Sequence, residues 1–223
     1  MDLDLSGSKA MVVGAEFAAG GAIALAFAEA GADVAVCALQ ADESVLTSRK
    51  VKRAIEALGR RSAEYVMDVM LGRNVQVTTR QIAKEMGGLD LVVSAAELPL
   101  EGPLDKISET DLARVVALNF SSHLFVIRSA AGEFARNEAG PNGRGSVLVL
   151  TRNLAEAQPG HAAFVAAQAG TQQLVREAGR EFAEAGVRVN ALSLAASATP
   201  EAIRTAALTL AMSDATAEVV NVD

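Results

Sequence analysis

Residues 10–36 read AMVVGAEFAAGGAIALAFAEAGADVAV and contain a strand, a glycine-bearing turn, a helix and the start of a second strand. Residues 10–13 are continuously apolar, a pattern typical of a strand buried on both faces of a parallel sheet. The helix is predicted over about 20–30, and Gly31 stands where it would end. Residues 33–39 (DVAVCAL) predict the next strand. A strand, a helix and a second strand in this order predict a right-handed parallel βαβ unit.

The same alternation continues to the end of the chain. Further strands are predicted over residues 62–66, 89–94, 146–151, 187–192 and 218–222. Further helices are predicted over residues 44–58, 73–86, 108–137, 161–185 and 200–212, the third of them opened by a capping-box pattern, SETD, at 108–111. Seven strands that alternate with six helices predict a Rossmann-like, doubly wound, seven-stranded parallel sheet flanked by helices. We find no linker or repeat, and therefore expect one domain over residues 1–223.

Composition excludes several classes of function. The 223 residues include 20 Lys and Arg against 27 Asp and Glu, a formal net charge of −7, which argues against nucleic-acid binding. The lack of Trp also removes a platform for base stacking. Cys37 is the sole cysteine and cannot form an internal disulfide. The N-terminus is acidic, and the longest apolar run, residues 17–28, is shorter than the roughly 20 residues of a membrane span. We therefore expect a cytoplasmic protein with no membrane partner.

Three segments together resemble the short-chain dehydrogenase/reductase family. Residues 14–36 resemble its first glycine-rich strand, turn and helix, residues 186–191 (GVRVNA) resemble its sixth strand, and residues 200–223 resemble its last helix and terminal strand. The resemblance covers nearly the whole chain. It implies a nicotinamide-dependent oxidoreductase with a Ser-Tyr-Lys catalytic centre assisted by an Asn.

The dinucleotide loop of the family, TGxxxGxG, is only partly kept. Residues 13–20 read VGAEFAAG, so Gly14 and Gly20 remain while the middle glycine is Ala18. Glu16 adds a carboxylate where the resemblance places the negatively charged pyrophosphate. The two retained glycines are also explained by tight turning and close packing of the helix on the sheet.

Other cofactor contacts implied by the resemblance are altered as well. The second strand ends at residues 37–39 (CAL), without an acid or an Arg for the ribose. The family's NNAG is SAAE at residues 94–97, and its Pro-Gly beside the nicotinamide is Ser-Leu at 193–194. Asp68 matches an acid near the adenine, but an Asp at a strand end is also an ordinary turn residue. We expect no cofactor in this chain.

The catalytic pattern of the family has changed too. Its YxxxK pair is Phe164 and Gln168, which have neither a hydroxyl nor a positive charge for proton transfer. The family's catalytic Ser falls at Thr151 or Arg152, and its helical Asn falls at Asn119. A Thr in a strand and an Asn that bonds nearby backbone are also ordinary structural residues. We expect no catalytic residue among these positions.

No other group replaces the lost centre in the sequence. Tyr65, the single tyrosine, lies on the third predicted strand, and His123 and His161 lie in or near helices, where structural roles are common. No cluster of His, Cys and carboxylates has metal-ligand spacing. The mobile substrate lid that the family inserts before its last helix is shortened near residues 198–200. We therefore expect no metal and no substrate cover.

The apolar helices near 111–137 and 161–185 and the C-terminal strand match the family's interfaces between subunits. We therefore expect an inactive subunit in a heterotetramer with an active paralogue that carries NAD. The chain resembles the degenerate subunit of a heteromeric member from anaerobic toluene degradation, which implies an aromatic CoA-thioester pathway. Two alternatives remain. One is an active NAD(P)-dependent oxidoreductase that uses Thr151 and Asn119, and the other is a regulatory module that binds a CoA thioester or a nucleotide fragment without turnover.

Overall fold

Seven strands form one parallel sheet, and neighbouring strands follow the order β3-β2-β1-β4-β5-β6-β7. The computed structural model describes residues 4–140 and 143–223. The strands are β1 (Lys9–Val13), β2 (Asp33–Ala38), β3 (Ser62–Val66), β4 (Leu91–Ser94), β5 (Gly145–Arg152), β6 (Val187–Leu194) and β7 (Val219–Val222). The strand order runs outward in both directions from β1 and β4, so the predicted single, doubly wound Rossmann-like domain is confirmed.

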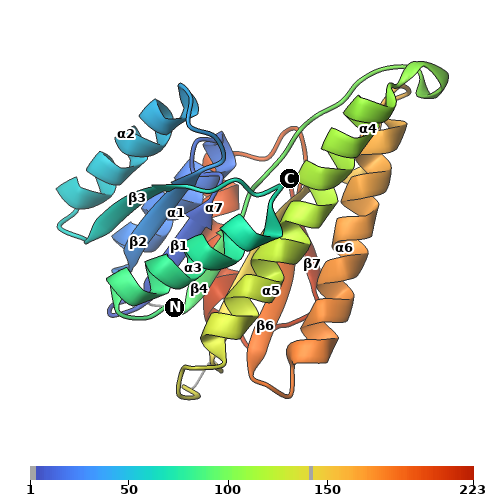
Figure 1. Cartoon of the computed structure of the whole chain (residues 1–223). Helices are drawn as coiled ribbons and strands as arrows, with labels where there is room; N and C mark the ends of the chain where they lie inside the picture. The colour runs from blue at the N-terminus through green and yellow to red at the C-terminus, as the bar shows by residue number, and fades with distance from the viewer. Residues whose placement is uncertain (1–3, 141–142) are drawn as a thin grey trace.

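Helices cover both faces of this sheet (Figure 1). They are α1 (Ala18–Glu29), α2 (Ser44–Ala57), α3 (Gly72–Met86), α4 (Glu109–Val116), α5 (Ser122–Phe134), α6 (Ala162–Phe182) and α7 (Pro200–Met212). Side chains alternate along β1, because successive residues of a strand point to opposite faces. Met11 and Val13 join the core under α3, α5 and α6, whereas Ala10 and Val12 join the core under α1 and α7.

The predicted helix over 108–137 is observed as two α-helices, α4 and α5, with a π-helical segment, Ala117–Ser121, between them. The capping prediction holds at its start, where Ser108 Oγ accepts the backbone N–H of Asp111 at 3.0 Å. The wider π turn carries Asn119, whose side-chain amide donates to the carbonyl oxygen of Val115 at 3.0 Å. The π segment therefore orients a buried amide in the middle of this helical run.

Strand boundaries differ from the prediction by a few residues. The second strand ends at Ala38 rather than Leu39, and the fourth begins at Leu91 rather than at residue 89. The fifth and sixth strands are longer than predicted, because hydrogen bonding between them continues as far as Arg152 and Leu194. Both extensions bring side chains to the end of the sheet where the candidate site lies.

The helical run from Glu109 to Phe134 is, among the described residues, the one whose length and composition would allow it to cross a bilayer. Half of its apolar window is buried inside the protein, as in the core helix of a globular domain. At the other end of the chain, only residues 195–199 connect β6 to α7. This short connection lies beside the candidate site.

Candidate functional site

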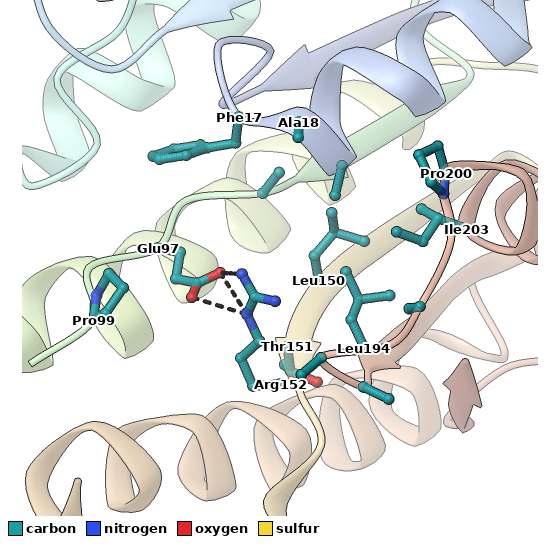
Figure 2. A pocket seen from close by; sticks show the side chains of 15 residues that line it. Phe17, Ala18, Glu97, Pro99, Leu150, Thr151, Arg152, Leu194, Pro200 and Ile203 are labelled. Carbon is teal, nitrogen blue, oxygen red and sulfur yellow. Dashed lines mark hydrogen bonds and ion pairs between the residues drawn. The ribbon is translucent and has the colours of Figure 1, made fainter. Parts of the chain in front are cut away.

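A pocket opens at the carboxyl ends of β1, β4, β5 and β6, beside the point between β1 and β4 where the strand order reverses (Figure 2). Open α/β sheets bind their ligands at such a switch point. The pocket has a volume of about 310 Å³. Its walls are mostly apolar, and the residues that line it include Phe17, Ala18, Pro99, Leu150, Leu194, Pro200 and Ile203.

An ion pair between Glu97 and Arg152 crosses the edge of this pocket (Figure 2). Arg152 Nε lies 2.9 Å from Glu97 Oε1 and 3.0 Å from Oε2, and Arg152 Nη2 lies 2.9 Å from Oε2. Strand register brings the two side chains together, because Ser94 on β4 pairs with Val149 on β5 and each charged residue comes three positions later. In the sequence, these two residues are only separate differences from the family pattern, and the pairing between them was not predicted.

A second cavity, of about 320 Å³, lies on the α6 side of this ion pair. Its lining includes His161, Phe164 and Val165, and it shares Glu97 and Arg152 with the first pocket. The ion pair therefore stands on the boundary between the two cavities. The resemblance places the nicotinamide beside Leu194, which lines both cavities.

The residues at the YxxxK positions are both buried. Gln168 Oε1 accepts the backbone N–H of Arg152 at 3.1 Å, and Gln168 Nε2 donates to Asn119 Oδ1 at 3.2 Å. Phe164 presents its ring to the second cavity, with no hydroxyl to exchange a proton. Gln168 thus fixes the end of β5 to α6, a role that depends on an uncharged amide with both an acceptor and a donor.

Asn119 and Thr151 use their polar atoms in bonds within the protein. Asn119 Oδ1 accepts the N–H of Leu98 at 3.0 Å, and its amide nitrogen donates to the carbonyl oxygen of Leu98 at 2.9 Å. Thr151 Oγ1 donates to the carbonyl oxygen of Leu192 at 3.3 Å and accepts from Gln172 Nε2 at 3.2 Å. Both side chains are buried, so their bonds match the structural roles considered for them above.

The glycine-rich turn is explained by close packing. Gly14 has a φ of +85°, which favours glycine, and a Cβ placed on Gly20 would lie 2.3 Å from the carbonyl oxygen of Gly14. Glu16 Oε1 accepts the backbone N–H of Leu39 at 2.8 Å, while its Oε2 is buried without a hydrogen-bond partner. Burial raises the pKa of the Glu16 carboxyl. Its carboxylate therefore lies between this turn, where the resemblance places the pyrophosphate, and the end of β2, where it places the ribose.

The remaining sequence candidates lie away from both cavities. Asp68 Oδ1 accepts the N–H of Met70 at 3.0 Å, as in a turn. Burial raises the pKa of the Cys37 thiol and also that of the Tyr65 hydroxyl, which donates to Glu85. The buried ring of His123 has its Nδ1 2.8 Å from Ser94 Oγ, and burial lowers its pKa to about 4.

The histidine that does reach a cavity is His161. It lines the second cavity, and its Nε2 is 4.0 Å from Glu101 Oε2. Within residues 4–140 and 143–223, no group of three or more His, Cys, Asp and Glu side chains could hold a metal ion. The site therefore has an apolar pocket and an internal ion pair, and no set of groups suited to metal chemistry.

Comparison with known proteins places this geometry in a family. The model described as enoyl-(acyl carrier protein) reductase matches residues 14–220. Hydroxynaphthalene reductase arp2 of Aspergillus fumigatus is 30% identical over 193 residues, which are 86% of this chain and 67% of that protein. The 3-oxoacyl-(acyl-carrier-protein) reductase FabG of Staphylococcus epidermidis is 28% identical over 83% of this chain and 73% of its own length.

Solved structures agree with these relatives. A putative short-chain alcohol dehydrogenase from Sinorhizobium meliloti 1021 superposes with a TM-score of 0.89 and 26% identity, over 100% of this chain and 97% of that one. A short chain dehydrogenase from Mycobacterium smegmatis gives a TM-score of 0.88 and 26% identity, over 98% and 92% of the two chains. The sequence relatives are named as oxidoreductases. The chain therefore belongs to the short-chain dehydrogenase/reductase family.

Proposed function

We propose that this chain is a non-catalytic subunit that binds an active member of its family, and that NAD-dependent chemistry takes place in that partner. The observation that carries the proposal is the ion pair between Glu97 and Arg152. It stands between the two cavities where a cofactor and a substrate would have to meet. A hydride donor and its acceptor need direct contact, and a bidentate ion pair at the boundary opposes that contact.

The residues present do not fit a dinucleotide. Glu16 places a half-buried carboxylate, with one oxygen already unpartnered, beside the turn where the resemblance puts the pyrophosphate. Glu97 adds a carboxylate to the pocket at the carboxyl ends of the strands. The pyrophosphate of a dinucleotide carries negative charge, and bringing like charges into a partly buried cleft is costly. The cofactor therefore belongs to the partner in this proposal.

The chain also lacks the side chains that would transfer a proton to the substrate. Loss of a positioned general acid typically lowers a rate by about 10²–10⁴-fold, and Phe164 has no proton to give. An active enzyme that uses Thr151 and Asn119 is disfavoured, because the internal hydrogen bonds of these residues occupy the atoms that would contact a substrate. A positioned acid has to lie within hydrogen-bond reach of the reacting group.

The surface that we assign to the partner centres on α4. Leu112 and Val116 lie one turn apart on this helix with exposed fractions of 45% and 40%, and Leu104 nearby is 68% exposed. Figure 1 shows α4 and α6 side by side, and the resemblance places the helices near 111–137 and 161–185 between subunits. The C-terminal strand β7 offers a second contact, because among residues 4–140 and 143–223 it pairs only with β6 and leaves its other edge available to another chain. Both contacts together would build a heterotetramer in the cytoplasm, and an aromatic CoA-thioester dehydrogenase is the partner that we favour.

The test is co-expression with dehydrogenases encoded beside this chain, followed by native mass spectrometry of the purified complex. We expect a heteromer with NAD bound only in the partner. The double variant Leu112→Asp and Val116→Asp should abolish the complex. Leu46→Asp is the matched control, because Leu46 is 56% exposed on α2, far from α4 in Figure 1, and should leave assembly intact. NADH oxidation by the isolated chain, or assembly that survives the double variant, would contradict the proposal.

A further inference from the structure

We propose that the pocket of Figure 2 binds a small, uncharged, largely apolar molecule that carries one carbonyl oxygen. The site lies on the α1 and α7 side of the ion pair between Glu97 and Arg152. The carbonyl oxygen would accept from the Arg152 guanidinium, and the apolar body would pack on the wall formed by β5, β6 and α7. This inference goes beyond the non-catalytic role and does not depend on it.

The size and the walls of the pocket define the apolar part of the ligand. Its volume of about 310 Å³ is roughly twice the 150 Å³ or so of an engineered apolar cavity that holds benzene, which points to one substituted ring or a short chain. Leu150, Leu194 and Ile203 form one wall, and Phe17, in the turn before α1, lines the pocket with its ring on the side of Glu97 (Figure 2). Pockets of this kind combine apolar walls with a few placed polar groups.

Arg152 supplies the placed polar group. Its Nε and Nη2 contact Glu97, but its Nη1 has no hydrogen-bond partner among the residues that the structure describes. Figure 2 shows this third nitrogen pointing away from Glu97, into the pocket and toward Leu194. The N–H groups of Nη1 can therefore donate to a ligand oxygen without breaking the ion pair, because a guanidinium carries five donors in a fixed geometry.

Glu97 favours a ligand oxygen that carries no negative charge. Its carboxylate lies about 3 Å from the Arg152 guanidinium, as the two Nε distances of 2.9 and 3.0 Å show, and already compensates the positive charge. A ligand carboxylate on Nη1 would bring a second negative charge close to the first, which disfavours the ionised form. A neutral carbonyl oxygen accepts the same hydrogen bond without that repulsion. The geometry therefore selects an uncharged acceptor over an acid.

The test uses three probes of similar size on the full chain: acetophenone, ethylbenzene without the oxygen, and benzoate with a negative charge. Methyl NMR spectra report both affinity and position through the methyl groups of Leu150, Leu194 and Ile203. We expect acetophenone to shift these methyl signals in a saturable way. Its affinity should exceed that of each of the other two probes by about tenfold, the size of one hydrogen bond to a charged donor.

Two variants test separately the hydrogen-bond donor on Arg152 and the effect of Glu97 on the charge of the ligand. Arg152→Gln should weaken acetophenone binding by about tenfold, since it removes the guanidinium donor. Glu97→Gln should reverse the selectivity and let benzoate bind at least as tightly as acetophenone, because Arg152 would then lack a compensating carboxylate. The matched control is the exposed ion pair of Arg180 and Glu177 on α6, where the same two substitutions should leave all probe affinities unchanged.

Three outcomes would overturn the proposal. The first is tight binding of benzoate to the unmodified chain. The second is a set of NMR shifts on acetophenone addition that does not include the methyl groups of Leu150, Leu194 and Ile203. The third is the absence of saturable acetophenone binding at millimolar concentration. None of these results bears on the partner proposal, which native mass spectrometry tests through assembly.

Discussion

Replacement of Gln168 by Lys would restore one half of the family's YxxxK pair, yet the structure predicts that it damages the fold. Gln168 is 1% exposed and bonds to both the backbone of Arg152 and the side chain of Asn119. A Lys side chain can donate to Asn119 but has no acceptor for the Arg152 N–H. The substitution therefore leaves one buried donor unpaired and introduces a buried ammonium.

The expected cost follows from these two effects. An unsatisfied buried donor costs about 1–3 kcal/mol. Burial of an amino group adds to this and lowers the pKa of the Lys. We expect the free energy of unfolding of Gln168→Lys at pH 7 to be lower by roughly 3 kcal/mol. This would be a large share of the roughly 5–15 kcal/mol that stabilises a typical protein.

Urea denaturation followed by circular dichroism measures this difference. The control is Gln173→Lys, one of the exposed positions of the same helix, where a Lys can pair with Glu177 in place of the hydrogen bond that Gln173 now makes. The control should stay within about 0.5 kcal/mol of the unmodified chain. Equal stability of the two Lys variants would refute the structural role given to Gln168. NAD(P)H oxidation by Phe164→Tyr combined with Gln168→Lys would refute the wider account of the cleft.

Three more predictions concern stability. Gly20→Ala should lower the free energy of unfolding by at least about 2 kcal/mol in urea titrations, because the new Cβ would meet a backbone oxygen at 2.3 Å. Gly132→Ala is the control: a Cβ there would meet open space, and the free energy of unfolding should rise by about 0.5–1 kcal/mol. The pKa of His123, lowered by burial from 6.5 to about 4, predicts that stability falls as the pH drops from 6.5 to 4, by about 3 kcal/mol. His123→Gln should flatten that part of the pH profile, and identical profiles would refute the assignment. Glu16→Gln should raise the melting temperature at pH 7 more than at pH 4, because burial raises the pKa of Glu16 and its ionised form is the destabilised one.

The fold could be predicted because its signal is local. Residues 10–13 are a short apolar run followed by Gly14, and the alternation of such strand patterns with helices allows few topologies. The limits of the strands were harder to predict, since they depend on a neighbour. β5 continues to Arg152 because β6 provides hydrogen bonds along its whole length, and the sequence of one strand does not contain that information.

The candidate site could be predicted only in part, for the same reason. Phe164 and Gln168 were located by their fixed spacing on one helix. The ion pair joins two residues 55 positions apart, and it becomes visible only when Ser94 and Val149 are known to be paired in neighbouring strands. The signal that could have revealed the ion pair is two opposite charges that follow paired strand positions by the same number of residues.

The carboxylate that Glu16 extends to the end of β2 has a consequence for the life of the protein in the cell. Enzymes that hold a nucleotide gain stability from it by mass action, so their resistance to unfolding and degradation follows the supply of that nucleotide. In this protein, the Glu16 side chain lies in part of the space that the resemblance assigns to the nucleotide. In the proposed complex, the half-life of this chain should therefore be insensitive to the redox and energy state of the cell, and should vary instead with the abundance of the proposed partner.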